Sequence, residues 1–161
     1  MAACQARGIV RDLILRFKYH RQEYLRRQLG EWLMETFQDE RIKCKKPDAF
    51  VPVPLFHRRR RERGYNQAEL LCEVLAEKTE IPILRALRRV RHTQTQTAFD
   101  RAERMENLRN AFQIRKGSNV RSLHLLLVDD VLTTGSTLDE CARVLRNAGA
   151  ASVRAICVAR G

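Results

Sequence analysis

The chain lacks the features that would place it outside ordinary globular proteins. Of its 161 residues only 7 are glycine and 4 are proline, and it has no internal repeat or low-complexity segment, so collagen-like and disordered chains are excluded. No apolar run approaches the roughly 18 residues of a membrane span, and residues 1–11 lack the apolar core of a secretory signal. We therefore expect a cytoplasmic protein with no membrane partner.

The cysteines do not form a disulfide framework. They stand at positions 4, 44, 72, 141 and 157, an odd number with no C-x-x-C pair. This spacing also argues against a ribbon-type zinc site. We expect buried apolar thiols, no zinc and no metal held by the side chains of the protein itself.

Positive charge is plentiful but regional. The formal net charge is +12, whereas residues 122–161 carry four basic and four acidic side chains and are neutral. The excess is densest at residues 57–63, which read HRRRRER. Such a run attracts a polyanion, either a nucleic acid or a small phosphorylated metabolite, unless it is only a solvated loop.

Hydrophobic periodicity predicts an α/β chain with a helical beginning. Apolar residues at helical spacing indicate helices, and a short apolar run between turn signals indicates a strand. The elements predicted before residue 102 are helices at 9–17, 24–37 and 66–78, a strand at 50–55, a weaker strand or loop at 81–87 and a long polar loop at 88–101. We divide the chain into a helical N-terminal region, residues 1–48, and an α/β domain, residues 49–161.

The C-terminal part of the chain predicts a strand, a helix and a second strand in succession. Residues 123–128 are nearly all apolar, as in a strand buried on both faces of a parallel sheet, and we expect the two aspartates that follow to end it. A helix is predicted at 138–148 and a strand at 153–158. Ligands of such βαβ units bind beyond the carboxyl ends of the strands, which places residues 129–137 at a candidate site.

The segment 129–137 reads DDVLTTGST and contains groups suited to a sugar phosphate. Gly135 lets backbone N–H groups approach an anion at the helix N-terminus, while Asp129 and Asp130 can accept hydrogen bonds from vicinal hydroxyls. A ribose 5-phosphate satisfies the whole segment. Alternatively, a hydroxyl only caps the helix and the aspartates lie on the surface. The hydroxyls that can donate to phosphate oxygens are those of Thr133, Thr134, Ser136 and Thr137.

The stretch VDDVLTTGST, preceded by an apolar strand, resembles the phosphoribosyl pyrophosphate (PRPP) signature of type I phosphoribosyltransferases. Together with VPVP at 51–54 and RGYNQ at 63–67, it is similar to the ComF/GntX group of that family. The resemblance implies a type I fold, a Rossmann-like parallel sheet flanked by helices, and binding of PRPP with Mg²⁺. It also implies that Asp129 and Asp130 hold the ribose hydroxyls and that residues 133–137 hold the 5-phosphate.

The same resemblance implies roles for three further segments. Residues 57–66 would bind pyrophosphate, with Arg63 as our preferred ligand beside Gly64. The loop 88–101 matches the mobile hood that closes over PRPP in such enzymes. The pair at 18–19 matches a Lys-Tyr pair common in the group, or is a solvated lysine and its neighbour.

Two classes of function follow. The first is a phosphoribosyltransferase in which Asp129, Asp130 and Arg63 are catalytic, Asp130 is a candidate base, and an unidentified nitrogenous acceptor displaces pyrophosphate. The second is non-catalytic: a PRPP sensor or, as the resemblance to the ComF group implies, an accessory protein of DNA uptake that binds nucleic acid through its basic N-terminal region. Single-stranded DNA or DNA-uptake proteins would be its partners. Because aromatic residues make up only 6% of the chain, such binding would be mainly electrostatic.

One departure from the group concerns the beginning of the chain. Members often start with a four-cysteine zinc ribbon, whereas here only Cys4 precedes the first predicted helix. The ribbon is therefore either lost or cut off.

Overall fold

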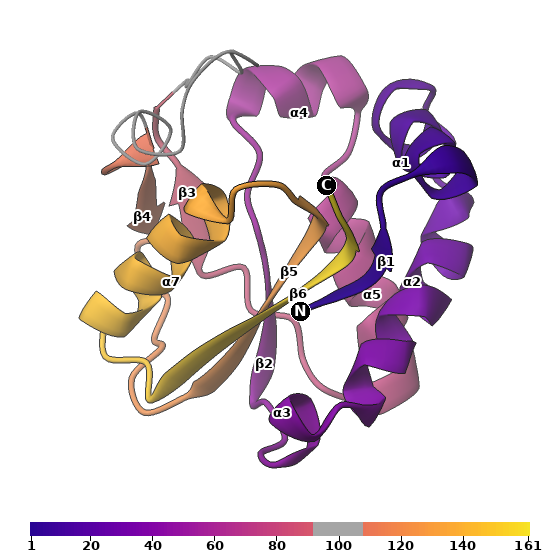
Figure 1. Ribbon diagram of the computed structural model, residues 1–161. Helices are drawn as coiled ribbons and strands as arrows, with labels where there is room; N and C mark the ends of the chain where they lie inside the picture. The colour runs from indigo at the N-terminus through magenta and orange to yellow at the C-terminus, as the bar shows by residue number, and fades with distance from the viewer. Residues whose placement is uncertain (92–107) are drawn as a thin grey trace.

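A computed structural model describes residues 1–91 and 108–161. Within them the central sheet has four parallel strands in the order β1-β6-β5-β2 (Figure 1). This confirms the predicted α/β class with a parallel sheet flanked by helices. The strands of this sheet are β1 (Ala2–Gln5), β2 (Ala49–Pro52), β5 (His124–Leu132) and β6 (Ser152–Arg160), and a separate antiparallel ribbon pairs β3 (Leu87–Arg89) with β4 (Phe112–Ile114).

Helices surround this sheet. The predicted helices near residues 9–17, 66–78 and 138–148 are all present with slightly different ends, and Asn66 caps its helix through a hydrogen bond from the Ala68 N–H, as predicted. Helical elements are α1 (Gly8–Tyr19), α2 (Leu25–Glu35), the 3-10 turn η1 (Thr36–Gln38), α3 (Glu40–Lys43), α4 (His57–Arg63), α5 (Gln67–Thr79) and α7 (Ser136–Asn147).

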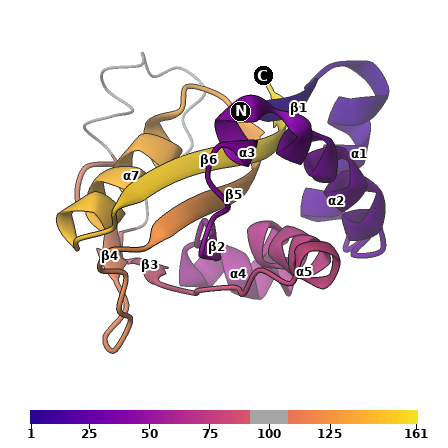
Figure 2. The same ribbon diagram turned by 90° about the horizontal axis from the view of Figure 1, so that it is seen from below.

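The core has two halves because side chains along a strand alternate between the two faces of a sheet. Leu126 and Val128 of β5 face the half that contains α1, α2 and α5. Leu125 and Leu127 face the half that contains α7 and the β3–β4 ribbon. Figure 2 shows α7 on one side of the sheet and α1, α2 and α5 on the other. Because β5 is covered on both faces, its apolar run is nearly continuous, as the sequence predicted.

Two predictions of secondary structure were wrong in ways that matter for the site. Sequence reasoning placed no strand before residue 49, yet β1 pairs with β6 at the edge of the sheet. It also ended the central strand before Asp129, whereas β5 continues to Leu132 because β6 supplies pairing partners as far as Arg160. The two aspartates are therefore strand residues. The division of the chain at residues 48 and 49 remains a prediction.

Smaller differences occur around the arginine-rich segment and the predicted loop. Residues 57–63, for which the sequence analysis predicted no helix or strand, form the helix α4. The strand predicted at 50–55 ends at Pro52. The segment 81–87 contributes one bridge, between Ile83 and Phe50, and the first residue of β3, Leu87. Of the loop predicted at 88–101, the first two residues belong to β3, and residues 92–101 lie outside the described residues.

Candidate functional site

The turn between β5 and α7 lies at the carboxyl edge of the sheet. Gly135 has a φ of +84°, a left-handed conformation, and is the N-cap of α7 without any side-chain hydrogen bond to the helix. Neither Ser136 nor Thr137 is therefore the cap. The hydroxyl oxygens of Thr134 and Ser136 lie 3.0 Å apart and bond to each other. The first backbone N–H groups of α7 consequently remain available to an anion.

The predicted phosphate-binding residues are contiguous in space as well as in sequence. Thr133 is exposed, Thr134 and Thr137 are half-buried, and Ser136 is buried as the first residue of α7. The hydroxyls thus surround the left-handed glycine. Their role in binding stays a prediction, supported by this geometry.

The two aspartates occupy consecutive positions of β5, so their side chains leave opposite faces of the strand. Asp130 is buried and Asp129 half-buried. The backbone N–H of Asp130 donates to a carboxylate oxygen of Asp129 at 2.9 Å. Burial raises the pKa of Asp129 to about 7, and the neighbouring Asp130 charge adds to the rise, whereas Lys18 opposes it. Ionising both carboxylates without a compensating positive charge therefore costs free energy.

Lys18 reaches this pair from α1. Its Nζ lies 2.8 Å from a carboxylate oxygen of Asp130. The sequence marked Lys18 and Tyr19 only by resemblance, and left a solvated lysine as the alternative. The structure excludes that alternative, since the Lys18 side chain is only 19% exposed.

Arg63 ends α4 and faces α1. Its guanidinium lies over the ring of Tyr19, 4.9 Å from the centroid, and one of its N–H groups donates to the side-chain oxygen of Gln67 at 3.0 Å. Gly64 follows as the C-cap of α4 with a φ of +87°. The end of α1 therefore contacts both predicted parts of the site, Asp130 through Lys18 and Arg63 through Tyr19.

The RGYNQ segment also has a structural task. The hydroxyl of Tyr65 donates to the carbonyl of Phe17 on α1. The side chain of Asn66 donates to the carbonyl of Val53 at 3.0 Å. These two bonds fix the connection between α4 and α5 against α1 and the end of β2.

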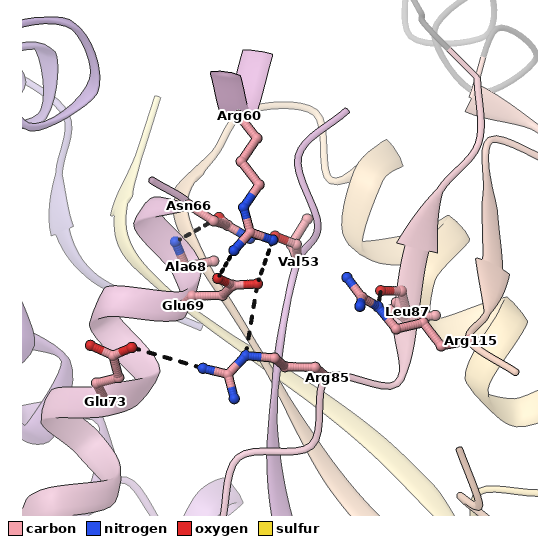
Figure 3. Close-up of polar contacts among 9 residues, drawn as sticks. All are labelled: Val53, Arg60, Asn66, Ala68, Glu69, Glu73, Arg85, Leu87 and Arg115. Atoms are coloured by element: carbon pink, nitrogen blue, oxygen red, sulfur yellow. Dashed lines mark hydrogen bonds and ion pairs between the residues drawn. The ribbon is translucent and has the colours of Figure 1, made fainter. Parts of the chain in front are cut away.

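Ion pairs hold α4 against α5. Arg60 donates to the carboxylate of Glu69 at 3.0 Å, and Arg85 lies 3.9 Å from the same carboxylate (Figure 3). Arg85 also lies 3.8 Å from Glu73, one helical turn further along α5. Glu69 is 12% exposed, so this network is partly shielded from solvent and fixes the direction of α4.

Arg89 of β3 is a residue that sequence reasoning missed, because it fell within the predicted polar loop. Its guanidinium lies 5.4 Å from the ring centroid of Phe112. Burial lowers the pKa of Arg89, and the charge of Arg59 on α4 lowers it further, while Asp129 opposes the shift. Arg89 thus lies within electrostatic reach of both Arg59 on α4 and Asp129 on β5.

The donor set determines how a metal ion could be held. Among the described residues, no three His, Cys, Asp or Glu side chains gather into a metal-binding group. Two carboxylates beside a turn with available N–H groups would fit a Mg²⁺ ion that arrives on a phosphorylated substrate, since Mg²⁺ keeps most of its ligands from water and phosphate. None of the helices in residues 1–91 and 108–161 has the length and the apolar character of a membrane span.

Comparison with known proteins identifies relatives of the chain. The family described as phosphoribosyl transferase domain matches residues 62–161. Competence protein F of Haemophilus influenzae is 40% identical over 152 residues, which cover 92% of this chain and 66% of the relative. DNA utilization protein YhgH of Salmonella typhi is 44% identical over 115 residues, 71% of this chain and 50% of the relative. The chain thus spans between half and about two thirds of these relatives.

A solved structure shares the fold. Glutamine PRPP amidotransferase from B. subtilis, complexed with ADP and GMP, superposes with a TM-score of 0.54 at 24% identity. The superposition covers 83% of this chain and 26% of the larger protein. At this identity the similarity concerns the fold alone.

Proposed function

Because the chain belongs to the phosphoribosyl transferase family and to its ComF-like members, we propose that it binds PRPP with Mg²⁺ and transfers the phosphoribosyl group to a nitrogenous acceptor. The observation that carries the proposal is the left-handed turn at Gly135 beside the acidic pair of β5. The turn offers an anion site, and the two carboxylates can accept hydrogen bonds from hydroxyls. Together, at one edge of the sheet, they match the phosphate and the sugar of a ribose 5-phosphate.

The proposed binding mode follows from where hydrogen-bond donors and acceptors lie along the carboxyl edge of the sheet. The 5-phosphate lies at the turn 133–137, where N–H groups and hydroxyls donate to its oxygens. The ribose hydroxyls donate to Asp129 and Asp130. The pyrophosphate points toward α4, where Arg63 is the proposed ligand and the other guanidinium groups of this helix add positive charge.

The proposed reaction is a substitution at C1 of the ribose. The C1–O bond breaks and its electron pair leaves on pyrophosphate, the lone pair of the acceptor nitrogen forms the C1–N bond, and the nitrogen loses a proton. Mg²⁺, carried by PRPP, offsets charge on the leaving group when bound. Arg63 stabilises the same charge. Asp130 lies beside the reacting ribose in this pose and is the proposed acceptor of the proton.

Calorimetric titration of PRPP with Mg²⁺ tests the binding step. The wild type should bind saturably at fixed moderate salt, and the double variant Asp129→Asn/Asp130→Asn should not. A folded wild type that shows no binding would contradict the proposal. Release of pyrophosphate on addition of candidate bases then separates an enzyme from a sensor that binds without turnover.

A second candidate function is binding of single-stranded DNA, and it rests on the exposed face of α4. Arg58, Arg60 and Arg61 are exposed there. Two tyrosines are also exposed: Tyr19 at the end of α1, at 64%, and Tyr24 at the beginning of α2, at 68%. Exposed guanidinium groups suit the phosphates of a single strand, and exposed rings suit its bases. Two relatives are named as competence or DNA utilization proteins. An affinity that falls steeply with salt and does not need Mg²⁺ would support this function.

A further inference from the structure

The ion pair between Lys18 and Asp130 is unusual in this protein for its burial. Of the ion pairs formed between described residues, it is the one in which both side chains are less than one fifth exposed, at 19% and 10%. Removing a lysine and a carboxylate from water costs free energy, and their attraction often does no more than offset that cost. Stability alone is therefore a poor explanation for a lysine at this position.

The backbone that carries Lys18 is fixed by its neighbours on both sides. Phe17 is fully buried, and its carbonyl accepts the hydrogen bond from the Tyr65 hydroxyl. Tyr19 lies under the Arg63 guanidinium. The ammonium group is thus held at the carboxyl edge by contacts with the RGYNQ segment, which belongs to a different part of the proposed site.

The chemistry of PRPP indicates what an ammonium group at this place would meet. In the α-anomer, the pyrophosphate at C1 and the hydroxyls at C2 and C3 project from the same face of the ribose ring. A carboxylate that accepts hydrogen bonds from these hydroxyls therefore lies on the face that also carries the leaving group. In the proposed pose, a cation 2.8 Å from that carboxylate therefore lies close to the leaving group.

We propose that Lys18 is a substrate-binding residue that donates to the pyrophosphate of PRPP from α1, opposite the arginines of α4. In the structure its ammonium group pairs with Asp130. When PRPP binds, the same group also contacts the leaving group and offsets its charge. This inference rests on the proposed function, because it needs PRPP at the carboxyl edge.

The variant Lys18→Gln tests the proposal, since its amide can still donate to Asp130 while the charge is removed. Three ligands are titrated separately: PRPP with Mg²⁺, pyrophosphate with Mg²⁺, and ribose 5-phosphate. We expect Lys18→Gln to weaken the first two by about tenfold to a hundredfold, as for loss of a charged hydrogen bond. The affinity for ribose 5-phosphate should change less than about twofold, as an order-of-magnitude bound.

Two further variants complete the experiment. Lys18→Arg keeps the charge and should restore most of the affinity for PRPP. Lys78→Gln is the matched control, because Lys78 forms an ion pair with Glu31 at 2.5 Å between α5 and α2, away from the carboxyl edge. It should leave all three affinities unchanged.

Each outcome decides the question. Unchanged binding of PRPP by Lys18→Gln would overturn the inference while leaving the proposed function intact. An equal loss for all three ligands would also overturn it, because Lys18 would then only position Asp130. Failure of the wild type to bind PRPP would overturn the proposed function and this inference together.

Discussion

Replacing Gly135 by alanine tests whether PRPP binding depends on the conformation of the β5–α7 turn, apart from any loss of stability of the whole protein. A Cβ at this position would lie 3.6 Å from Leu132 and 3.7 Å from Asp139, which are ordinary van der Waals distances. The cost is therefore in the backbone, which has a φ of +84°. For a residue with a Cβ this conformation costs roughly 1–2 kcal/mol.

Gly117 supplies a matched control. It also has a φ of +84°, a Cβ there meets nothing within 4 Å, and it lies in the connection that enters β5 at its other end. Both Gly135→Ala and Gly117→Ala should lower the melting temperature by similar amounts, about 2–8 °C for a chain of this size. Only Gly135→Ala rotates peptide groups that would face a phosphate.

The assay combines thermal unfolding with titration of PRPP in the presence of Mg²⁺. We expect both variants to be destabilised and only Gly135→Ala to bind at least about tenfold more weakly, as for loss of one or two hydrogen bonds to a charged group. Wild-type affinity in a destabilised Gly135→Ala variant would refute the reasoning, because the N–H groups of this turn would then not hold the phosphate.

Three other predictions follow from the packing and the charges. Gly30→Ala places a Cβ 2.5 Å from Cγ1 of the Val74 side chain, which is stiff because it is β-branched. Urea unfolding should show a loss of stability of about 1–3 kcal/mol. The second change Val74→Ala should largely remove this loss. Because the pKa of Asp129 is higher in the folded chain than its ordinary value of about 4, folding favours the protonated form, and the free energy of unfolding should fall as the pH rises from about 4 to about 7. Asp129→Asn should flatten this fall, and an unchanged slope would contradict the shift. If α4 binds DNA, Arg58→Ala/Arg61→Ala should reduce the salt dependence of binding by about one counterion for each phosphate that the variant no longer neutralises, and an unchanged dependence would exclude this face.

The amino-acid sequence was sufficient for much of the α/β organisation. The apolar run that became β5, the amphipathic helices and the cap at Asn66 depend on local periodicity and local hydrogen bonding, which short segments of sequence record. The DDVLTTGST segment marked a candidate anion site for the same reason. Its chemistry and its position after a buried strand are both contiguous in the chain.

The tertiary structure decided the contacts between distant segments. The strand β1 could not be predicted because its apolar and polar residues do not alternate, and it is a strand only because the edge of β6 is free to pair with it. The pairing of β5 with β6 likewise extended β5 through both aspartates. Arg89, which lies within electrostatic reach of Asp129, comes from a segment that looked like a polar loop.

Lys18 shows the difference most clearly. Its sequence context, near the end of an amphipathic helix, is the same for a solvated lysine and for a ligand-binding one. Only the folded chain, in which Tyr65 holds the end of α1 against the RGYNQ segment, places its ammonium group beside Asp130. The sequence by itself determined most of the helices, the buried part of the central strand and the chemistry of the segment 129–137, because these depend on neighbouring residues. The tertiary structure determined which charges meet, because that depends on residues far apart in the chain.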